Sequence, residues 1–231
     1  MTWPRTVEEL ERVQLELARQ EPEPWQPARL EALLVGGVFV CFERGRAGAG
    51  SPGDRAWAGA AVTCGKEWRA SAEVLGAAGD AFRSGWLALR EGPLLEEAVK
   101  RLSVTPDVLL VDATGRDHPR RAGLALELGQ ILEIPTIGVT RRPLVARAAI
   151  PPRAEGARAP LLHDDELVGY FLRPAVDSNP IVVHAGWRTS PEVAVRVVES
   201  CLFGHRTPEP LRRARQLARK TRSLDQSTRT V

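Results

Sequence analysis

Cysteine, long apolar runs and nucleotide-binding glycine loops are scarce or missing in this sequence. Its three cysteines, Cys41, Cys64 and Cys201, have neither paired spacing nor a zinc-binding pattern, so we expect reduced thiols and a cytoplasmic protein. No apolar run approaches the roughly 20 residues that a membrane span requires, and the charged N-terminus does not match a secretory signal. The phosphate-binding patterns GxGxxG and GxxxxGK are absent. We therefore expect no disulfide framework, no membrane association and no generic nucleotide-binding enzyme.

The composition is typical of one soluble globular unit. The 231 residues, of which 43% are hydrophobic and 26% charged, can bury a substantial core. Neither an internal repeat nor a long linker divides the chain. We therefore expect residues 1–231 to form a single domain and the protein to be a monomer.

The small net charge of +3 is unevenly placed. From His205 to Arg222 there are seven Lys and Arg against one Glu, on a stretch with helical character. The basic C-terminal stretch, residues 205–231, either tracks a phosphate backbone or forms a solvated terminal face. The charge pattern leaves both interpretations open.

Residues 107–142, DVLLVDATGRDHPRRAGLALELGQILEIPTIGVTRR, organise the chain. Two short apolar runs, 108–111 and 134–139, are typical of strands buried on both faces, and a helix from Pro119 to about Glu133 joins them. Such a unit forms a right-handed parallel crossover. Residues just past the carboxyl ends of parallel strands face the ligand crevice. Asp112 and the Arg141/Arg142 pair should therefore share one crevice, as metal-assisted phosphate chemistry requires.

The expected crossover helix begins with two cations where acids are usual. Pro119 suits the first helical position. Arg120 and Arg121 would then lie at the positive end of the helix dipole, which disfavours each by roughly 0.3–1 kcal/mol. Either an external anion such as a phosphate lies between the free N–H groups and the arginines, or both arginines turn outward into solvent.

The remaining elements follow from caps, periodicity and turn residues. Three antiparallel strands followed by strand–helix–strand units predict an α/β protein with a ribonuclease H-like fold, a mixed sheet with helices on both faces. In chain order we expect a helix at 6–20, strands at 33–42, 56–64 and 67–75, a loop at 76–90 exposing Phe82 and Trp86, a helix from Glu91 or Pro93 to Ser103, a surface excursion at 145–165, strands at 166–173 and 181–185, and a helix at 191–202.

Seven stretches in order, spanning nearly the whole chain, resemble endonuclease V, the family that nicks DNA beside deaminated adenine (hypoxanthine, or inosine). The most specific combination is HPRR with its upstream Asp, joined to REGP and IPTIGV. The stretches are RVQLELA, GGVFVCFE, GWLALREGPLLEEA, PDVLLVDATGRDHPRRAGLA, IPTIGVTRR, SNPIVVHAGWRTS and RTPEPLRRA.

The resemblance implies a metal site built from three carboxylates, of which two are present. Glu91 matches the second carboxylate and Asp112 the last. Two carboxylates would bind Mg²⁺ or Mn²⁺ only weakly. The bound ion would supply the attacking hydroxide. Arg141 stands where the family has a Lys near the scissile phosphate, so the implied catalytic set is Glu91, Asp112 and Arg141. The alternative for Glu91 is an acid at a helix start, favoured by the dipole.

Two positions depart from the family pattern. The first-strand Asp of the family falls on Phe39, and its active-site His falls on Trp187; neither side chain can bind a metal. Glu43 lies on the same strand face as Phe39 but roughly 13 Å away, so it cannot substitute. The resemblance therefore implies reduced or lost activity.

The recognition residues are better matched. In the loop AFRS, Phe82 takes the place of the family's wedge Tyr and can stack or insert. Ala113 and Thr114 depart from the family's usual pair, which affects the pocket's shape. The expected nucleic-acid-binding residues are Phe82, Gly85, Leu87, Gly115, His118, Arg120, Arg121 and Gly123.

Two hypotheses follow from these residues. One is a Mg²⁺-dependent nuclease that hydrolyses a phosphodiester near a deaminated base. The other is a catalytically impaired relative that binds nucleic acid. DNA or RNA containing deaminated bases is the expected partner in both.

Overall fold

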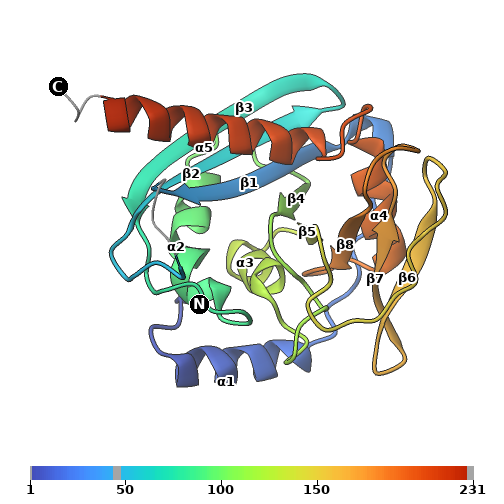
Figure 1. Ribbon diagram of the computed structural model, residues 1–231, viewed down its shortest axis with the longest axis horizontal. Helices are drawn as coiled ribbons and strands as arrows, with labels where there is room; N and C mark the ends of the chain where they lie inside the picture. The colour runs from blue at the N-terminus through green and yellow to red at the C-terminus, as the bar shows by residue number, and fades with distance from the viewer. Residues whose placement is uncertain (1, 44–47, 228–231) are drawn as a thin grey trace.

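A single mixed sheet organises the protein (Figure 1). The computed structural model describes residues 2–43 and 48–227. Its eight strands have the order β3-β2-β1-β4-β5-β8-β7-β6. The strands are β1 Leu34–Phe42, β2 Arg55–Cys64, β3 Glu67–Ala77, β4 Val108–Val111, β5 Thr136–Thr140, β6 Arg158–His163, β7 Glu166–Leu172 and β8 Ile181–Ala185.

The middle of the sheet is parallel and its flanks are antiparallel. β1 pairs with β4, and β4 with β5, in parallel, as the crossover pattern predicted. β1, β2 and β3 form the predicted antiparallel meander. All four residues of β4 are fully buried, as expected for a strand covered on both faces. The ribonuclease H-like arrangement is thereby confirmed.

Helices cover both faces of this sheet (Figure 1). On one face, α2 (Leu87–Lys100) and α3 (Leu124–Leu132) pack on β1, β2 and β4, with α1 (Val7–Ala18) outside them. On the other face lie α4 (Pro191–Ser200) and α5 (Glu209–Ser227). Within the described part of the chain, no helix is both long and apolar enough to cross a bilayer.

Two glycines let α5 lie directly on the sheet. A Cβ on Gly37 would come within 2.3 Å of the Pro210 backbone, and one on Gly59 within 2.5 Å of the Ala214 carbonyl oxygen. Only glycine permits so close a backbone approach. The side chains that follow Ala214 on α5 are therefore held over the end of β1, where the candidate site lies.

Two helices begin elsewhere than predicted. α3 begins at Leu124, not at Pro119, because Arg121 is left-handed (φ 57°) and interrupts any helix through 119–123. α2 begins at Leu87, so Glu91 lies inside the helix rather than at its start. Pro93 lies inside α2, where it cannot donate the helical hydrogen bond to the Leu89 carbonyl. The next carbonyl, that of Arg90, accepts the Gly79 N–H at 3.1 Å.

The expected surface excursion at 145–165 is wrong in its second half. Residues 158–163 form β6, the edge strand of the sheet, and Leu161 on it is fully buried. Arg147 and Leu162 also exchange two backbone hydrogen bonds, at 2.8 and 2.9 Å. The many Pro, Arg and Ala residues of this stretch are typical of a loop, but residues 158–163 alternate between buried and exposed positions, as in an edge strand.

Candidate active site and base pocket

The structure brings the two predicted carboxylates together. Asp112 directly follows β4, and Glu91 projects from α2. Burial, and then the neighbouring charge of Asp112, raise the pKa of Glu91 to about 8, whereas Arg90 opposes the change. The interpretation of Glu91 as a helix-start acid is wrong, since it is the fifth residue of α2.

Phe39 lies beside Asp112. Val38 and Val111 are partners on the parallel strands β1 and β4. The next residues are Phe39, still on β1, and Asp112, directly after the end of β4. Side chains at such neighbouring positions point to the same face of a sheet. Phe39 packs against Trp57 and Ala218 on the α5 side. A phenyl ring therefore occupies the position next to Asp112 on the face that α5 covers.

A guanidinium from α5 bonds the remaining carboxylate. Arg215 Nη2 lies 3.0 Å from Asp112 Oδ2. The same guanidinium lies 4.9 Å from the centroid of the Phe39 ring, and that of Arg219 lies 5.8 Å from it. Both distances suit a cation–π contact. Sequence reasoning missed Arg215, because only the fold joins residues separated by 103 positions.

This arrangement does not fit a divalent cation. Mg²⁺ prefers oxygen ligands, but Phe39 offers none and Arg215 already bonds an oxygen of Asp112. Among residues 2–43 and 48–227, no group of three or more His, Cys, Asp or Glu side chains is placed to hold a metal ion. The neighbourhood of Asp112 is thus arranged around guanidinium groups.

A cavity of about 170 Å³ opens next to Asp112. Four of the predicted recognition residues, Phe82, Gly85, Leu87 and His118, line it. Its other lining residues are Gln14, Arg83, Ser84, Asp112, Ala113, Thr114, Leu124, Thr140 and Leu144. The structure therefore places four of the eight expected recognition residues around a cavity that Asp112 also lines.

Gly115 and Gly123 shape the cavity's wall without lining it. A Cβ on Gly115 would lie 2.0 Å from the Ala185 carbonyl oxygen, and one on Gly123 2.4 Å from both Thr114 oxygens. The Gly123 N–H also donates to the Gly115 carbonyl at 2.9 Å. Larger residues would displace the loop that carries Ala113 and Thr114.

His118 holds the cavity's floor in place. Its Nε2 lies 3.0 Å from the Gly85 carbonyl oxygen, and its Nδ1 accepts the Arg120 N–H at 3.2 Å. Burial lowers the pKa of His118 to about 4, although the Gly85 contact opposes this. The ring is therefore neutral at pH 7, with Nε2–H as the donor, and it fixes Gly85 in its left-handed conformation (φ 84°).

Gln14 on α1 is a second support that sequence reasoning missed. Its side-chain nitrogen donates to the Gly85 carbonyl at 3.1 Å, and its oxygen accepts from Arg120 Nε at 2.6 Å. Gln14 is only 1% exposed. Its position inside the matched stretch RVQLELA was the only signal in the sequence.

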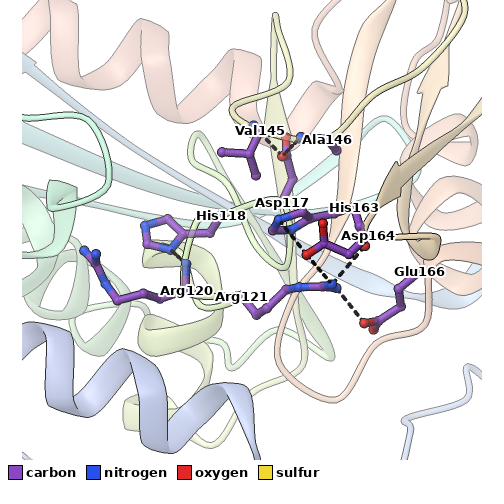
Figure 2. A network of polar contacts seen from close by, with 9 residues as sticks. All are labelled: Asp117, His118, Arg120, Arg121, Val145, Ala146, His163, Asp164 and Glu166. Atoms are coloured by element: carbon purple, nitrogen blue, oxygen red, sulfur yellow. Dashed lines mark hydrogen bonds and ion pairs between the residues drawn. The ribbon is translucent and has the colours of Figure 1, made fainter.

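Arg120 and Arg121 have protein partners (Figure 2). Arg121 bonds Glu166 at 2.5 Å and the His163 carbonyl at 2.9 Å, while Arg120 pairs with Glu11 at 3.2 Å. The prediction that Arg120 and Arg121 lie at a helix N-terminus is wrong, because α3 begins at Leu124. The alternative that both side chains turn outward into solvent is also wrong, because each forms an ion pair within the protein. A role for either arginine in nucleic-acid binding remains a prediction.

Loop 78–86 carries the two aromatics that the sequence singled out. Phe82 is 52% exposed, as expected for a wedge. Trp86 is partly buried against the core below α2 and is flanked by the guanidinium groups of Arg83 and Arg120, at 5.8 and 5.9 Å. The exposed aromatic of this loop is therefore Phe82.

Arg141 and Arg142 follow the end of β5 and are exposed. β5 is the parallel neighbour of β4, and Thr140 and Asp112 line the same cavity. Neither Arg141 nor Arg142 lines that cavity, so a crevice shared by Asp112 and the two arginines remains a prediction. The catalytic role of Arg141 remains a prediction.

Most of the basic C-terminal stretch is engaged within the protein. Arg212 and Arg213 both pair with Glu209, at 2.7 and 2.6 Å. Arg222 is only 7% exposed and donates to the Phe42 carbonyl. The interpretation as a fully solvated face is wrong, because several of its cations form ion pairs or hydrogen bonds within the protein. Contact of this stretch with a phosphate backbone remains a prediction. Residues 228–231 lie outside the described residues.

Trp187 lies elsewhere than the carboxylates. It packs with Leu17 and Leu126 of α1 and α3, and its backbone N–H donates to Thr136 Oγ1 at 2.9 Å. Thr136 begins β5, whereas Asp112 follows the end of the parallel strand β4. Trp187 and Asp112 therefore lie at opposite ends of the parallel strands β4 and β5, and the structure separates two positions that were expected in one site.

The chain is similar in sequence and in fold to known proteins. A family model described as Endonuclease V matches residues 31–216. Endonuclease V of Methanopyrus kandleri is 42% identical over 170 residues, covering 68% of this chain and 73% of the relative. That of Trichormus variabilis is 34% identical over 221 residues, covering 94% and 95%.

Solved structures of the family have the same fold. Endonuclease V from Streptomyces avermitilis superposes with a TM-score of 0.83 at 33% identity, covering 98% of this chain and 96% of that structure. The catalytic domain of human Endonuclease V gives 0.81 at 29% identity, covering 95% and 97%. With the family match and the mixed sheet, these relations show that the chain belongs to the endonuclease V family.

Proposed function

We propose that this chain recognises a deaminated base, inosine, in DNA or RNA, and that its Mg²⁺-dependent cleavage of the phosphodiester is lost or strongly reduced. The observation that carries the proposal is the ion pair of Asp112 with Arg215 over Phe39, directly beside the base cavity. The cavity supports recognition, while the ion pair opposes metal binding.

Recognition requires a base that has left the duplex. Base-flipping proteins read an extruded base by hydrogen bonds to its edge and by contact with its faces. The cavity offers polar groups on Ser84 and Thr114, and apolar walls from Leu87 and Leu124. Phe82, exposed at the cavity's mouth, is the residue that would fill or wedge the space left in the stack.

A relative of known structure indicates the substrate class. Ciona intestinalis Endonuclease V has been solved with a 24mer DNA containing an inosine followed by a ribo-adenosine. That protein is 22% identical to this chain, with a TM-score of 0.73, which is a likeness of fold. Inosine-containing nucleic acid as the ligand of this chain is our proposal.

Loss of cleavage follows from the state of Asp112. A metal ion would have to compete with Arg215 for the carboxylate, and Phe39 supplies no ligand in return. The Asp112–Arg215 ion pair is partly shielded from water, so breaking it costs free energy. Metal binding by only two carboxylates would offset little of that cost. Asp112 is therefore expected to act as an anchor for Arg215.

The second candidate is an active Mg²⁺-dependent nuclease. The observation that favours it is that the charge of Asp112 helps to raise the pKa of Glu91, since Mg²⁺ can be held by one or two carboxylates together with substrate phosphates. This alternative requires Arg215 to release Asp112 when nucleic acid binds.

Binding and cleavage can be tested separately. Fluorescence anisotropy in EDTA should show tighter binding to a duplex with one inosine than to the same duplex with adenine. Leu87→Ala, which enlarges the cavity, should reduce that preference. Leu75→Ala, at an exposed position of β3, should leave it unchanged. Equal affinities for the two duplexes would contradict the proposed recognition.

A further inference from the structure

Two arginines of α5 form a paired group over one aromatic ring. Arg215 and Arg219 are separated by one helical turn, so their side chains lie on the same face of α5. Their guanidinium carbons lie 4.9 and 5.8 Å from the Phe39 ring centroid. Phe39 itself is held by Cys41, Trp57 and Ala218. The ring is thus a fixed platform beneath two positive charges.

The hydrogen-bonding capacity of this pair is largely unused. A guanidinium has five N–H donors. Arg215 bonds Asp112 through Nη2, and its buried Nε has no hydrogen-bond partner in the described part of the protein. Arg219 is exposed and forms no ion pair within residues 2–43 and 48–227. Donors therefore remain for a ligand with several acceptor oxygens.

The local charge also favours an anion. Among the ion pairs of residues 2–43 and 48–227, the acid bonded to this pair is Asp112, and the Phe39 ring beneath the two guanidinium groups carries no charge. The side chains of Arg215 and Asp112 are 17% and 33% exposed, so an anion can reach them from solvent. Asp112 also lines the base cavity, which places the arginine pair next to the nucleotide that the cavity would hold.

We propose that Arg215 and Arg219 form a clamp that binds a backbone phosphate of nucleic acid without a metal ion. The inference rests on the proposed function for its ligand, because the phosphate belongs to the strand whose base enters the cavity. Planar guanidinium groups bind phosphate oxygens in a two-point geometry. Phe39 holds them in position by cation–π contact, and Asp112 anchors Arg215 until the phosphate arrives.

The clamp has a signature in the salt dependence of binding. A phosphate contact releases counterions, so each cation in contact adds about 1 to the slope of log affinity against log salt concentration. Phosphate contacts do not read sequence, so their loss weakens all DNA equally. A metal-mediated contact would instead disappear in EDTA.

The experiment is a KCl titration of binding in EDTA, by fluorescence anisotropy, with inosine and adenine duplexes. Arg219→Gln and Arg215→Gln should each reduce the slope by about 1 and weaken both duplexes by the same factor. Arg215→Lys should keep the slope but bind more weakly, because an ammonium lacks the planar fork. Arg196→Gln, an exposed charge on α4, is the matched control and should leave the slope unchanged.

Two results would overturn the clamp. One is an unchanged slope in both glutamine variants. The other is binding that vanishes in EDTA and returns with Mg²⁺. Arg219 is exposed, so its variant remains informative even if Arg215→Gln fails to fold. A missing preference for inosine contradicts the proposed function alone, whereas an unchanged slope contradicts the clamp alone.

Discussion

Glu127 should make the stability of this protein depend on pH. It lies on α3 and is fully buried, and neither of its carboxylate oxygens has a hydrogen-bond partner in the described part of the protein. Burial raises the pKa of Glu127 from 4.5 to about 8. The folded protein therefore holds this proton at neutral pH, while the unfolded chain releases it.

The size and sign of the effect follow from proton linkage. The raised pKa means that the contribution of Glu127 to stability is fully present below pH 4.5 and is lost as pH rises towards 8. Between these values each pH unit costs the folded state up to about 1.4 kcal/mol. The whole loss is roughly 3–5 kcal/mol. Above pH 8 it stays constant.

Glu127→Gln should remove this dependence, because an amide of nearly the same shape does not titrate. Urea unfolding at a series of pH values gives the difference in free energy of unfolding between variant and parent. The variant should become more stable relative to the parent as pH rises. Any part of the difference that is the same at every pH is the free-energy cost of burying the amide. Glu133→Gln, at an exposed position just after the same helix, is the control. A difference that does not change between pH 5 and pH 8 would refute the reasoning.

Two further predictions concern the loops around the cavity. Phe82→Ala should weaken binding to inosine-containing DNA by roughly 1–3 kcal/mol, the usual value of one aromatic stack, with little change in melting temperature because Phe82 is 52% exposed; a large fall in melting temperature would instead mark Phe82 as a core residue. Arg121→Gln should lower the melting temperature, because it removes the ion pair with Glu166 and the bond to the His163 carbonyl. If Arg121 also contacts a phosphate, the same variant should flatten the salt slope of DNA binding, and an unchanged slope would contradict that role.

Local patterns in the sequence were sufficient to predict most of the sheet. The runs 108–111 and 134–139 became the parallel pair β4 and β5, because buried strands need continuous apolar residues. The strands expected at 56–64 and 67–75 became the antiparallel pair β2 and β3. Phe82 and His118 were placed at one cavity by the resemblance to the family, since no local pattern joins them.

Contacts between distant residues were beyond the reach of those patterns. Arg121 was predicted in a helix, but its side chain is drawn to Glu166 and the backbone there is left-handed. In the sequence, nothing distinguishes Arg215 from the other basic residues near it. It reaches Asp112 because Gly37 and Gly59 let α5 lie close to the sheet. Propensity and periodicity describe neighbours along the chain, while both of these positions depend on partners from other elements.

The central claim, that Arg215 keeps Asp112 from metal-dependent chemistry while the cavity still binds inosine, is tested most directly by a single-turnover nicking assay. Inosine-containing DNA, saturated with protein, is incubated with Mg²⁺ or Mn²⁺, and the unmodified protein is compared with Asp112→Asn. We predict that the DNA is bound and that the unmodified protein nicks it no faster than Asp112→Asn does. Nicking beside inosine that depends on Asp112 would contradict this account.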